Sequence, residues 1–344
     1  MRICARAPLR LGLCGGGTDV SPYCDKYGGA VLNITIDLYA YTILTPTDND
    51  QISFIATDTG DRFESASSDD LEIAEPLRLH RATYRRIVRQ YNGGQPLSCD
   101  VTTFCDAPPG SGLGTSSTMV VSMVKAYVEW LNLPLGEYEI AHLAYEIERM
   151  DAGLAGGRQD QYAATFGGVN FMEFHKSDRV IVNPLRIKNW IVSELETSMI
   201  LFDSGVSRSS AKIINEQTSN VNHERGTTIA ALHELKADAY QMKDSLLKGD
   251  FDGIATCMRK TWIDKKRLAF NVSNLHIDEL MQVAMDAGAC AGKITGAGGG
   301  GFAMFLVEPH RRMEVIAALS GRSQGRVLNC HLTHQGTTAW KILR

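Results

Sequence analysis

The first half of the chain alternates between segments with the composition of β-strands and segments with the spacing of helices. Residues 30–46 are rich in Val, Ile, Thr and Tyr, which predicts strand structure. Residues 115–130 instead repeat apolar side chains at helical spacing, which predicts a strong amphipathic helix. By the same reasoning we expect strands at 2–10, 51–63, 97–105, 168–174 and 180–182, and helices at 76–91 and 135–150.

A composition shift near residues 187–196 separates this pattern from a second one. Strands and helices follow in mixed order, with hairpin signals in the first half, which favours α+β domains over a doubly wound parallel sheet. We therefore predict two domains, residues 1–190 and 191–344. The second should contain helices at 209–219, 224–248, 251–270 and 277–287, and strands at 198–202, 302–307 and 328–332.

Composition narrows the class of protein. A length of 344 residues suits about two domains, and 44% apolar with 22% charged residues is ordinary for a soluble globular protein. The net charge of -4 argues against a general binder of nucleic acid or membrane surfaces, because these usually present a basic face. The N-terminal apolar stretch is short and interrupted by arginines, so we expect a cytoplasmic protein without a signal peptide or membrane span.

Cysteine usage agrees with that expectation. The eight cysteines are scattered, mostly inside apolar runs, and no CxxC pair occurs. This pattern predicts buried, reduced thiols rather than disulfides or a zinc site. The residues are Cys4, Cys14, Cys24, Cys99, Cys105, Cys257, Cys290 and Cys330.

The sharpest motif is PPGSGLGTSS at 108–117, which runs directly into the expected helix at 115. Its alternating glycines let the backbone approach a ligand closely, and a helix N-terminus offers free amides and a positive dipole end to phosphate. It lacks the lysine of a Walker A loop and the spacing of the dinucleotide fingerprint. A flexible loop before a capped helix is the alternative. The expected phosphate-binding residues are Pro109, Gly110, Ser111, Gly112, Leu113, Gly114, Thr115, Ser116 and Ser117.

A second glycine-rich turn, KITGAGGGG at 293–301, lies between apolar segments of the second domain. So many glycines in a row serve either close backbone approach to a ligand or the unusual dihedrals of a tight turn. The residues alone leave both interpretations open.

Three motifs in this order resemble those of the GHMP kinases, the family of galactokinase, homoserine kinase and mevalonate kinase. They are the segments 7–19, 109–117 and 293–301, which together span nearly the whole chain. The resemblance implies an N-terminal domain like ribosomal protein S5 domain 2 and a ferredoxin-like C-terminal domain. It also implies ATP bound by the middle loop, with contacts from Gly298 and Gly299, and phosphorylation of a hydroxyl group.

Phosphoryl transfer needs positioning, charge neutralisation and an acceptor for the hydroxyl proton. The resemblance assigns the acceptor to Asp160, within the segment GGRQDQY at 156–162. It places Arg10 near that carboxylate, where a cation would stabilise charge during transfer. From the residues alone, Asp160 as a turn residue and Arg10 as a surface cation are the alternatives.

Magnesium prefers oxygen ligands, usually few from protein and the rest from phosphate and water. The resemblance implies a helix glutamate together with a loop hydroxyl, for which Ser116 is the candidate. Glu146 and Glu148 both flank the buried face of the helix at 135–150, so periodicity does not choose between them. Distance to the motif favours Glu148, with a solvated glutamate as the alternative for either residue.

Departures from galactokinase bear on the substrate. Galactokinases carry Glu-His where this chain has Gly16 and Gly17, which puts galactose in doubt. The first motif and the segments 156–162, 205–211 and 262–274 look like those of the D-glycero-D-manno-heptose 7-phosphate kinases. Those members phosphorylate the anomeric hydroxyl, giving a 1,7-bisphosphate for bacterial surface polysaccharide precursors. The expected sugar ligands are Gly16, Gly17, Thr18, Asp19, Arg158, Asp160, Arg208 and Gly298.

Several questions stay open. A sugar phosphate needs a second cationic pocket, and the run Lys265, Lys266 and Arg267 is either part of it or a solvated helix face. A 1-kinase for a free sugar such as L-fucose is the alternative enzyme, and a sugar sensor without catalysis is the alternative class. The expected partners are small molecules, ATP and a sugar phosphate, and the sequence does not choose between a monomer and a homodimer.

Overall fold

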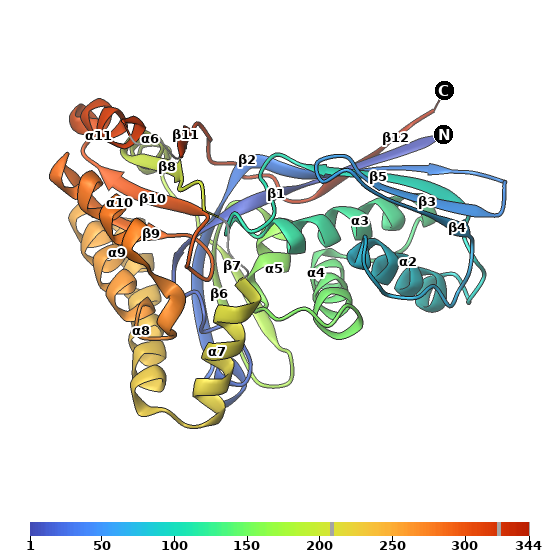
Figure 1. Ribbon diagram of the computed structural model, residues 1–344, viewed down its shortest axis with the longest axis horizontal. Coiled ribbons are helices and arrows are strands. Elements are labelled where there is room, and N and C mark those ends of the chain that lie inside the picture. Colours follow the sequence, from blue (N-terminus) through green and yellow to red (C-terminus); the bar gives the residue numbers. More distant parts are fainter. Residues whose placement is uncertain (207–209, 322–324, 344) are drawn as a thin grey trace.

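The structure, a computed structural model, describes residues 1–206, 210–321 and 325–343. Within these ranges the chain forms two sheets, each covered by helices (Figure 1). The larger has the order β12-β1-β2-β5-β3-β4, with β6 and β7 joined through β2. Its strands are β1 (Arg2–Cys14), β2 (Gly29–Pro46), β3 (Gln51–Ala56), β4 (Asp61–Ala66), β5 (Cys99–Cys105), β6 (Val169–Phe174), β7 (Val180–Pro184) and β12 (Thr338–Ile342).

The long strand β2 organises this sheet. One edge pairs with β1 along most of its length, while the other pairs with β6 through Gly29–Ile34 and with β5 through Ala40–Pro46. A register shift in β1 between Pro8 and Arg10 bends the strand where the sheet divides. This bend sets Arg10 at the junction of the two halves of the sheet.

Helices cover one face of the larger sheet (Figure 1). The expected apolar face of the helix from 115 is confirmed, because Val120, Val124 and Tyr127 are buried in one core with Ile3 and Phe54 of the sheet. The elements of this layer and its connections are α1 (Tyr23–Tyr27), α2 (Arg78–Tyr91), α3 (Thr115–Leu131), α4 (Glu137–Glu146), the π-helical turn η1 (Ile147–Asp151) and α5 (Gln159–Phe166).

The smaller sheet has the antiparallel order β11-β8-β10-β9. Numbered along the chain this is 4-1-3-2, the ferredoxin-like arrangement, so that expectation is confirmed. Its strands are β8 (Met199–Asp203), β9 (Ala289–Ile294), β10 (Phe302–Val307) and β11 (Arg326–Leu328). Its helices are α6 (Asn189–Ser198), α7 (Ser210–Asn222), α8 (Gly226–Lys248), α9 (Phe251–Lys265), α10 (Leu275–Asp286) and α11 (Arg312–Ser320), with 3-10 turns η2 (Phe270–Val272) and η3 (Pro309–Arg311).

The end of the chain returns to the larger sheet. Strand β12 pairs antiparallel with β1 from Arg2↔Ile342 to Arg6↔Thr338, and Figure 1 shows the two termini side by side. A boundary near residue 190 remains our proposal, with the qualification that 338–342 pair with the first sheet. The α+β class that we predicted, rather than a doubly wound parallel sheet, is confirmed, because β3–β5 is the one parallel pairing among the described strands.

Some elements differ from the sequence expectation. The strand expected at 328–332 ends at Leu328, and Leu332 forms only an isolated bridge with Ile36. The helix expected to reach 270 ends at Lys265. The short elements α5, α6, α11 and β12 were not expected, since five to ten residues carry little periodicity.

Two expectations about the whole chain can be compared with the structure. All eight cysteines are free, as predicted. In the described ranges, no helix combines the length and apolarity needed to cross a membrane.

Candidate active site

One cavity lies where the loop before α3, the start of α5 and the turn after β9 meet. Its walls come from both halves of the chain, because α7 and α9 face α3 and α5 across it. Most residues singled out by the sequence line it. The lining includes Arg10, Gly17, Asp19, Gly110, Gly112, Gly114, Thr115, Ser116, Ser117, Glu148 and Asp160, together with Arg149, Gly157, Gln159, Lys265, Gly296 and Ala297.

The loop before α3 has the backbone that its glycines predict. Gly110, Gly112 and Gly114 have φ of 79°, 78° and 81°, in the left-handed region that favours glycine. Gly114 is the N-cap of α3 and supplies no side-chain cap, so the first amides of the helix remain available to a ligand. The loop therefore presents backbone donors and a helix dipole to the cavity, as an anion site requires.

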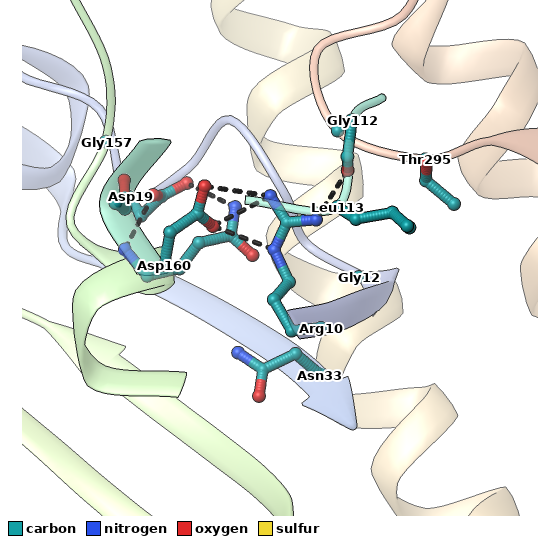
Figure 2. A network of polar contacts seen from close by, with 12 residues as sticks. Arg10, Gly12, Asp19, Asn33, Gly112, Leu113, Gly157, Asp160 and Thr295 are labelled. Atoms are coloured by element: carbon teal, nitrogen blue, oxygen red, sulfur yellow. Dashed lines mark hydrogen bonds and ion pairs between the residues drawn. The ribbon is translucent and has the colours of Figure 1, made fainter. Parts of the chain in front are cut away.

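The two glycine-rich turns lie against each other. A Cβ added to Gly112 would sit 2.7 Å from the Thr295 carbonyl oxygen, and Figure 2 shows these residues facing one another. Within the second turn, Gly296 and Ala297 line the cavity. Gly298 and Gly299, the residues expected from sequence, instead pack against Val272, whose carbonyl accepts a 2.8 Å bond from the Gly299 amide. The residues of this turn that line the cavity thus lie two positions before the pair expected from sequence, whose contact with ATP stays a prediction.

Asp160 and Arg10 form a bidentate pair at the centre of the cavity (Figure 2). Arg10 Nε donates to Asp160 Oδ1 at 2.8 Å and Nη2 donates to Oδ2 at 2.9 Å, while Nη1 donates to the Gly112 carbonyl at 2.6 Å. Arg10 is only 3% exposed, whereas the Asp160 side chain keeps 19% of its surface accessible. One guanidinium therefore fixes the carboxylate relative to the phosphate loop.

Asp160 sits in the first turn of α5 rather than in the glycine-rich loop that we expected. A Cβ placed on Gly114 would lie 3.3 Å from Asp160 Oδ2, so the carboxylate lies directly beside the loop. Because α5 is packed through Tyr162 and Ala163, the helix holds this carboxylate more rigidly than a loop would.

Glu148, and not Glu146, faces the phosphate loop. It lies in the π-helical turn after α4, a feature often found at functional sites, and is 1% exposed. Ser116 Oγ donates to its Oε1, Ser117 Oγ donates to Oε2 at 2.6 Å, and Gln161 Nε2 donates to Oε2 at 2.7 Å. Glu146 instead pairs with Arg86, at 3.0 Å.

This group of oxygens fits a hard divalent cation. The described residues contain no cluster of three or more His, Cys, Asp and Glu side chains that would hold a metal alone. A carboxylate and a serine hydroxyl opening onto a phosphate loop match instead the magnesium sites that share their ion with phosphate and water. Ser116 and Glu148 are thus brought together by the fold as candidate ligands.

Asp19 lies beside Asp160 and is held by backbone donors. Its Oδ1 accepts from the Gly17 amide at 3.0 Å and its Oδ2 from the Gln159 amide at 3.1 Å. A Cβ on Gly157 would come within 1.9 Å of Asp19 Oδ2, so only glycine fits there. Gly157 thus allows the first motif to approach the start of α5, a role that the sequence did not reveal.

Several expected ligands lie behind the cavity wall. Thr18 is fully buried, and its hydroxyl donates to the Gly15 and Ala30 carbonyls. Leu113 is also fully buried and its carbonyl accepts from the Arg10 amide at 3.1 Å. Ser111 is 3% exposed, and its carbonyl accepts from the Phe302 amide. The side chains of Thr18, Ser111 and Leu113 are therefore buried within the loops, and their role in binding a ligand stays a prediction.

The cations differ from the expected set. Arg158 is 4% exposed and pairs with Asp25 at 3.0 Å and with Asp178 at 2.7 Å, so its charge is already neutralised. Arg208 lies outside the described residues. Lys265, read as part of a charge run, lies inside the cavity instead, and burial together with Arg10 lowers the pKa of its ammonium to about 8.

The sequence interpretation also missed Arg149, which lines the cavity and an adjoining one shared with Arg158, Asn215 and Thr218. Arg149 forms an ion pair with Glu148 at 3.2 Å, and its hydrogen bonds to carbonyls and to Ser117 Oγ measure 3.3–3.4 Å, longer than a charge-assisted bond usually is. In the sequence, its position directly after Glu148 was the feature that could have pointed to this arginine.

A second, more apolar cavity opens on the other side of the α3 N-terminus. Thr115 and Ser116 line both cavities, so the two adjoin. Its other walls come from Leu77, Leu79 and Met119. Apolar walls beside a phosphate loop suit a nucleoside, and nothing in the sequence pattern indicated them.

Crowding between the glycine-rich turns supports a prediction. We expect Gly112→Ala to raise the KM for ATP by about 10-fold or more, because the new methyl displaces one phosphate turn from the other. Gly60→Ala is the matched control, with φ of 78° but nothing within 4 Å of the added carbon. It should share the cost of backbone strain, measured as a lower Tm, and keep its KM. Equal KM values in both variants would contradict this account of the loop.

A carboxylate held by Arg10 beside a glycine-rich loop at a helix N-terminus, with serine and carboxylate oxygens that suit a divalent cation, is the kind of arrangement that phosphoryl transfer uses. Residues 78–168 match the family of GHMP kinases N terminal domains, and residues 242–322 match the family of GHMP kinases C terminal domains. The D-glycero-alpha-D-manno-heptose 7-phosphate kinase of Campylobacter jejuni is 47% identical over 98% of each chain. This chain belongs to the GHMP kinase family.

Two further relatives differ in how much sequence and length they share with this chain. A crystal structure of a D-glycero-D-manno-heptose 1-phosphate kinase from Bacteroides thetaiotaomicron superposes with a TM-score of 0.84, at 46% identity over 99% of this chain and 100% of that one. The bifunctional fucokinase/GDP-fucose pyrophosphorylase of Arabidopsis thaliana is 26% identical over 88% of this chain but only 29% of its own length. Similarity is therefore much higher to the heptose phosphate kinases than to the fucokinase.

Proposed function

We propose that this protein transfers the terminal phosphoryl group of ATP to the anomeric hydroxyl of D-glycero-D-manno-heptose 7-phosphate, giving the 1,7-bisphosphate. The observation that carries the proposal is the position of the Asp160 carboxylate beside Gly114 of the phosphate loop, in one cavity. The identity to the Campylobacter jejuni enzyme supports the choice of sugar. The product would serve nucleotide-activated heptose for bacterial surface polysaccharides.

Asp160 accepts the proton of the attacking hydroxyl in this proposal. Its Oδ atoms face the cavity while Arg10 holds them by two hydrogen bonds. A positioned carboxylate of this kind contributes about 10²- to 10⁴-fold to a proton-transfer step. Arg10 also donates to the Gly112 carbonyl, so it keeps the base in register with the loop that would hold the phosphates.

Ser116 and Glu148 are the proposed magnesium ligands. The ion, when bound, neutralises charge on the phosphates and fixes their orientation. The buried carboxylate of Glu148 is oriented by Ser117 and Gln161, so it is preorganised without the metal. Nucleoside binding is assigned to the adjoining apolar cavity beside Met119.

The sugar is assigned to the part of the cavity beside Asp19, where small residues replace the bulky ones of galactokinases. Gly17 and Asp19 line this region, and Asp19 and Arg149 also line the adjoining cavity. Its size and charge suit a seven-carbon sugar with a distal phosphate. Gly16, Arg158 and Arg208 remain proposals as further substrate contacts.

A substrate panel tests the proposal. We expect ATP consumption with heptose 7-phosphate, and kcat/KM at least about 10²-fold lower with the heptose 1-phosphate or with free heptose, because each lacks a group that the site is built to bind. The position of the new phosphate is read by NMR. Turnover of the 1-phosphate alone would overturn the choice of acceptor.

Two alternatives give different results in the same panel. A 1-kinase for a free sugar would prefer L-fucose over every sugar phosphate. A sensor would bind sugar, seen as ligand-dependent thermal stabilisation, without forming ADP. The buried Arg10–Asp160 pair and the Glu148 oxygen site favour an enzyme over a sensor.

A further inference from the structure

Lys265 is a buried cation in the active-site cavity that the proposed mechanism does not use. It occupies the last turn of α9, from the C-terminal half of the chain, and is 6% exposed. Its Nζ donates to the carbonyl of Gly296 in the second glycine-rich turn. A Cβ on Gly16 would lie 3.6 Å from the same nitrogen. The ammonium thus stands between the first motif and the third.

The charge of Lys265 is not neutralised by a partner. Among the described residues no acidic side chain forms an ion pair with it, although a lysine ammonium has three protons to donate. Arg10, by contrast, is paired with Asp160, and Lys266 next along the chain is exposed. A buried, unpaired charge is costly to folding, so an anion is the partner that this position lacks.

The surroundings of Lys265 identify that anion. The cavity wall around it consists of the phosphate loop, the Gly296 turn and the Arg10–Asp160 pair. A phosphoryl group transferred from the loop to a hydroxyl beside Asp160 would lie in the same cavity as this ammonium. We infer that Lys265 binds a non-bridging oxygen of the transferred phosphoryl group and is a further catalytic residue.

This inference rests on the proposed transfer from ATP to a sugar hydroxyl. The hydroxyl oxygen forms the new bond to phosphorus, its proton passes to Asp160, and ADP leaves with the electron pair of the broken P–O bond. Lys265 stays protonated throughout and offsets charge on the phosphoryl oxygens. Arg10 stays hydrogen-bonded to Asp160, so Arg10 and Lys265 have separate roles.

The pH dependence gives a signature that a structural role would not produce. Burial, and next to it the charge of Arg10, lower the pKa of Lys265 to about 8, whereas Asp19, Cys14 and Asp160 act in the opposite direction. The active, protonated form is lost as pH rises, so kcat/KM should fall above about pH 8. Burial and the charge of Lys265 also lower the pKa of Lys293 on β9, to about 7. A variant that changes only residue 265 separates the two lysines.

The experiment compares Lys265→Met, Lys265→Arg and the matched control Lys266→Met in the full-length enzyme with ATP and magnesium. We expect Lys265→Met to lower kcat by about 10²-fold, as for loss of one transition-state donor, with KM for ATP within about 3-fold. Lys266→Met should retain normal kinetics. The Tm of Lys265→Met should equal or exceed that of wild type, because the buried charge is gone.

The arginine variant completes the test. The kcat/KM of Lys265→Arg should be higher than that of Lys265→Met. It should no longer fall above pH 8, since the guanidinium group stays charged. Normal kcat in Lys265→Met, a rise confined to KM for ATP, or an unchanged pH profile in Lys265→Arg would each overturn the inference. The kinetic constants of each variant are divided by those of the wild type, measured with whichever sugar the wild type accepts. A wrong choice of heptose therefore shows in the wild-type substrate panel, and a wrong role for Lys265 shows in these variant-to-wild-type ratios.

Discussion

Replacing Asp160 by asparagine is expected to lower kcat by about 10³-fold, because the amide cannot take up the proton of the attacking hydroxyl. The substitution keeps the shape of the side chain and its place in the first turn of α5. ATP binding should persist, since the phosphates are assigned to backbone donors of the loop at 110–117. The measurement is kcat at saturating ATP and sugar, together with the Kd for ATP from a direct titration.

Loss of an arginine–aspartate pair also affects folding, so a matched control is needed. Arg86 and Asp151 form a bidentate pair outside the cavity, with two hydrogen bonds of 2.7 Å and an aspartate that is 22% exposed, close to the 19% of Asp160. We expect Asp151→Asn to lower Tm as Asp160→Asn does, while leaving kcat near the wild-type value. Near-normal turnover in Asp160→Asn would remove this residue as the base.

The second large effect is expected at Glu148. In Glu148→Gln the neutral amide is a poorer magnesium ligand than the carboxylate, and an NH2 group replaces one of the two oxygens that accept from Ser116 and Ser117. We expect the magnesium concentration for half-maximal activity to rise at least about 10-fold. Substitutions of residues that only support a metal ligand already lower metal affinity by about 10- to 100-fold. The assay titrates magnesium at fixed ATP and reads ADP formation, with kcat obtained at saturation.

Glu146→Gln is the natural control for this experiment, since helical periodicity alone did not distinguish the two glutamates. Glu146 pairs with Arg86 on the side of α4 that faces α2, away from the phosphate loop. Its substitution should leave the magnesium dependence unchanged. A shift in Glu146→Gln equal to that in Glu148→Gln would show that the effect is one of general stability, and the metal assignment would be lost.

The sequence by itself determined the class of fold and the identity of the main chemical groups. Local spacing was sufficient for long elements such as β2 and α3, whose patterns extend over many residues. Three glycine-containing motifs in order identified the family, because glycine at left-handed or crowded positions has no substitute. Arg10 and Ser116 followed from their places in those motifs, and Asp160 from the segment at 156–162 that resembles the family.

Only the tertiary structure decided which side chains face the cavity. Glu148 was selected over Glu146 by a π-helical turn that no periodicity announces, and Thr18 and Leu113 turned inward because their motifs pack against the sheet. Lys265 and Lys266 are neighbours in a charge run, yet α9 buries one and exposes the other. Contacts between distant segments set burial, and burial sets which charges act on a ligand.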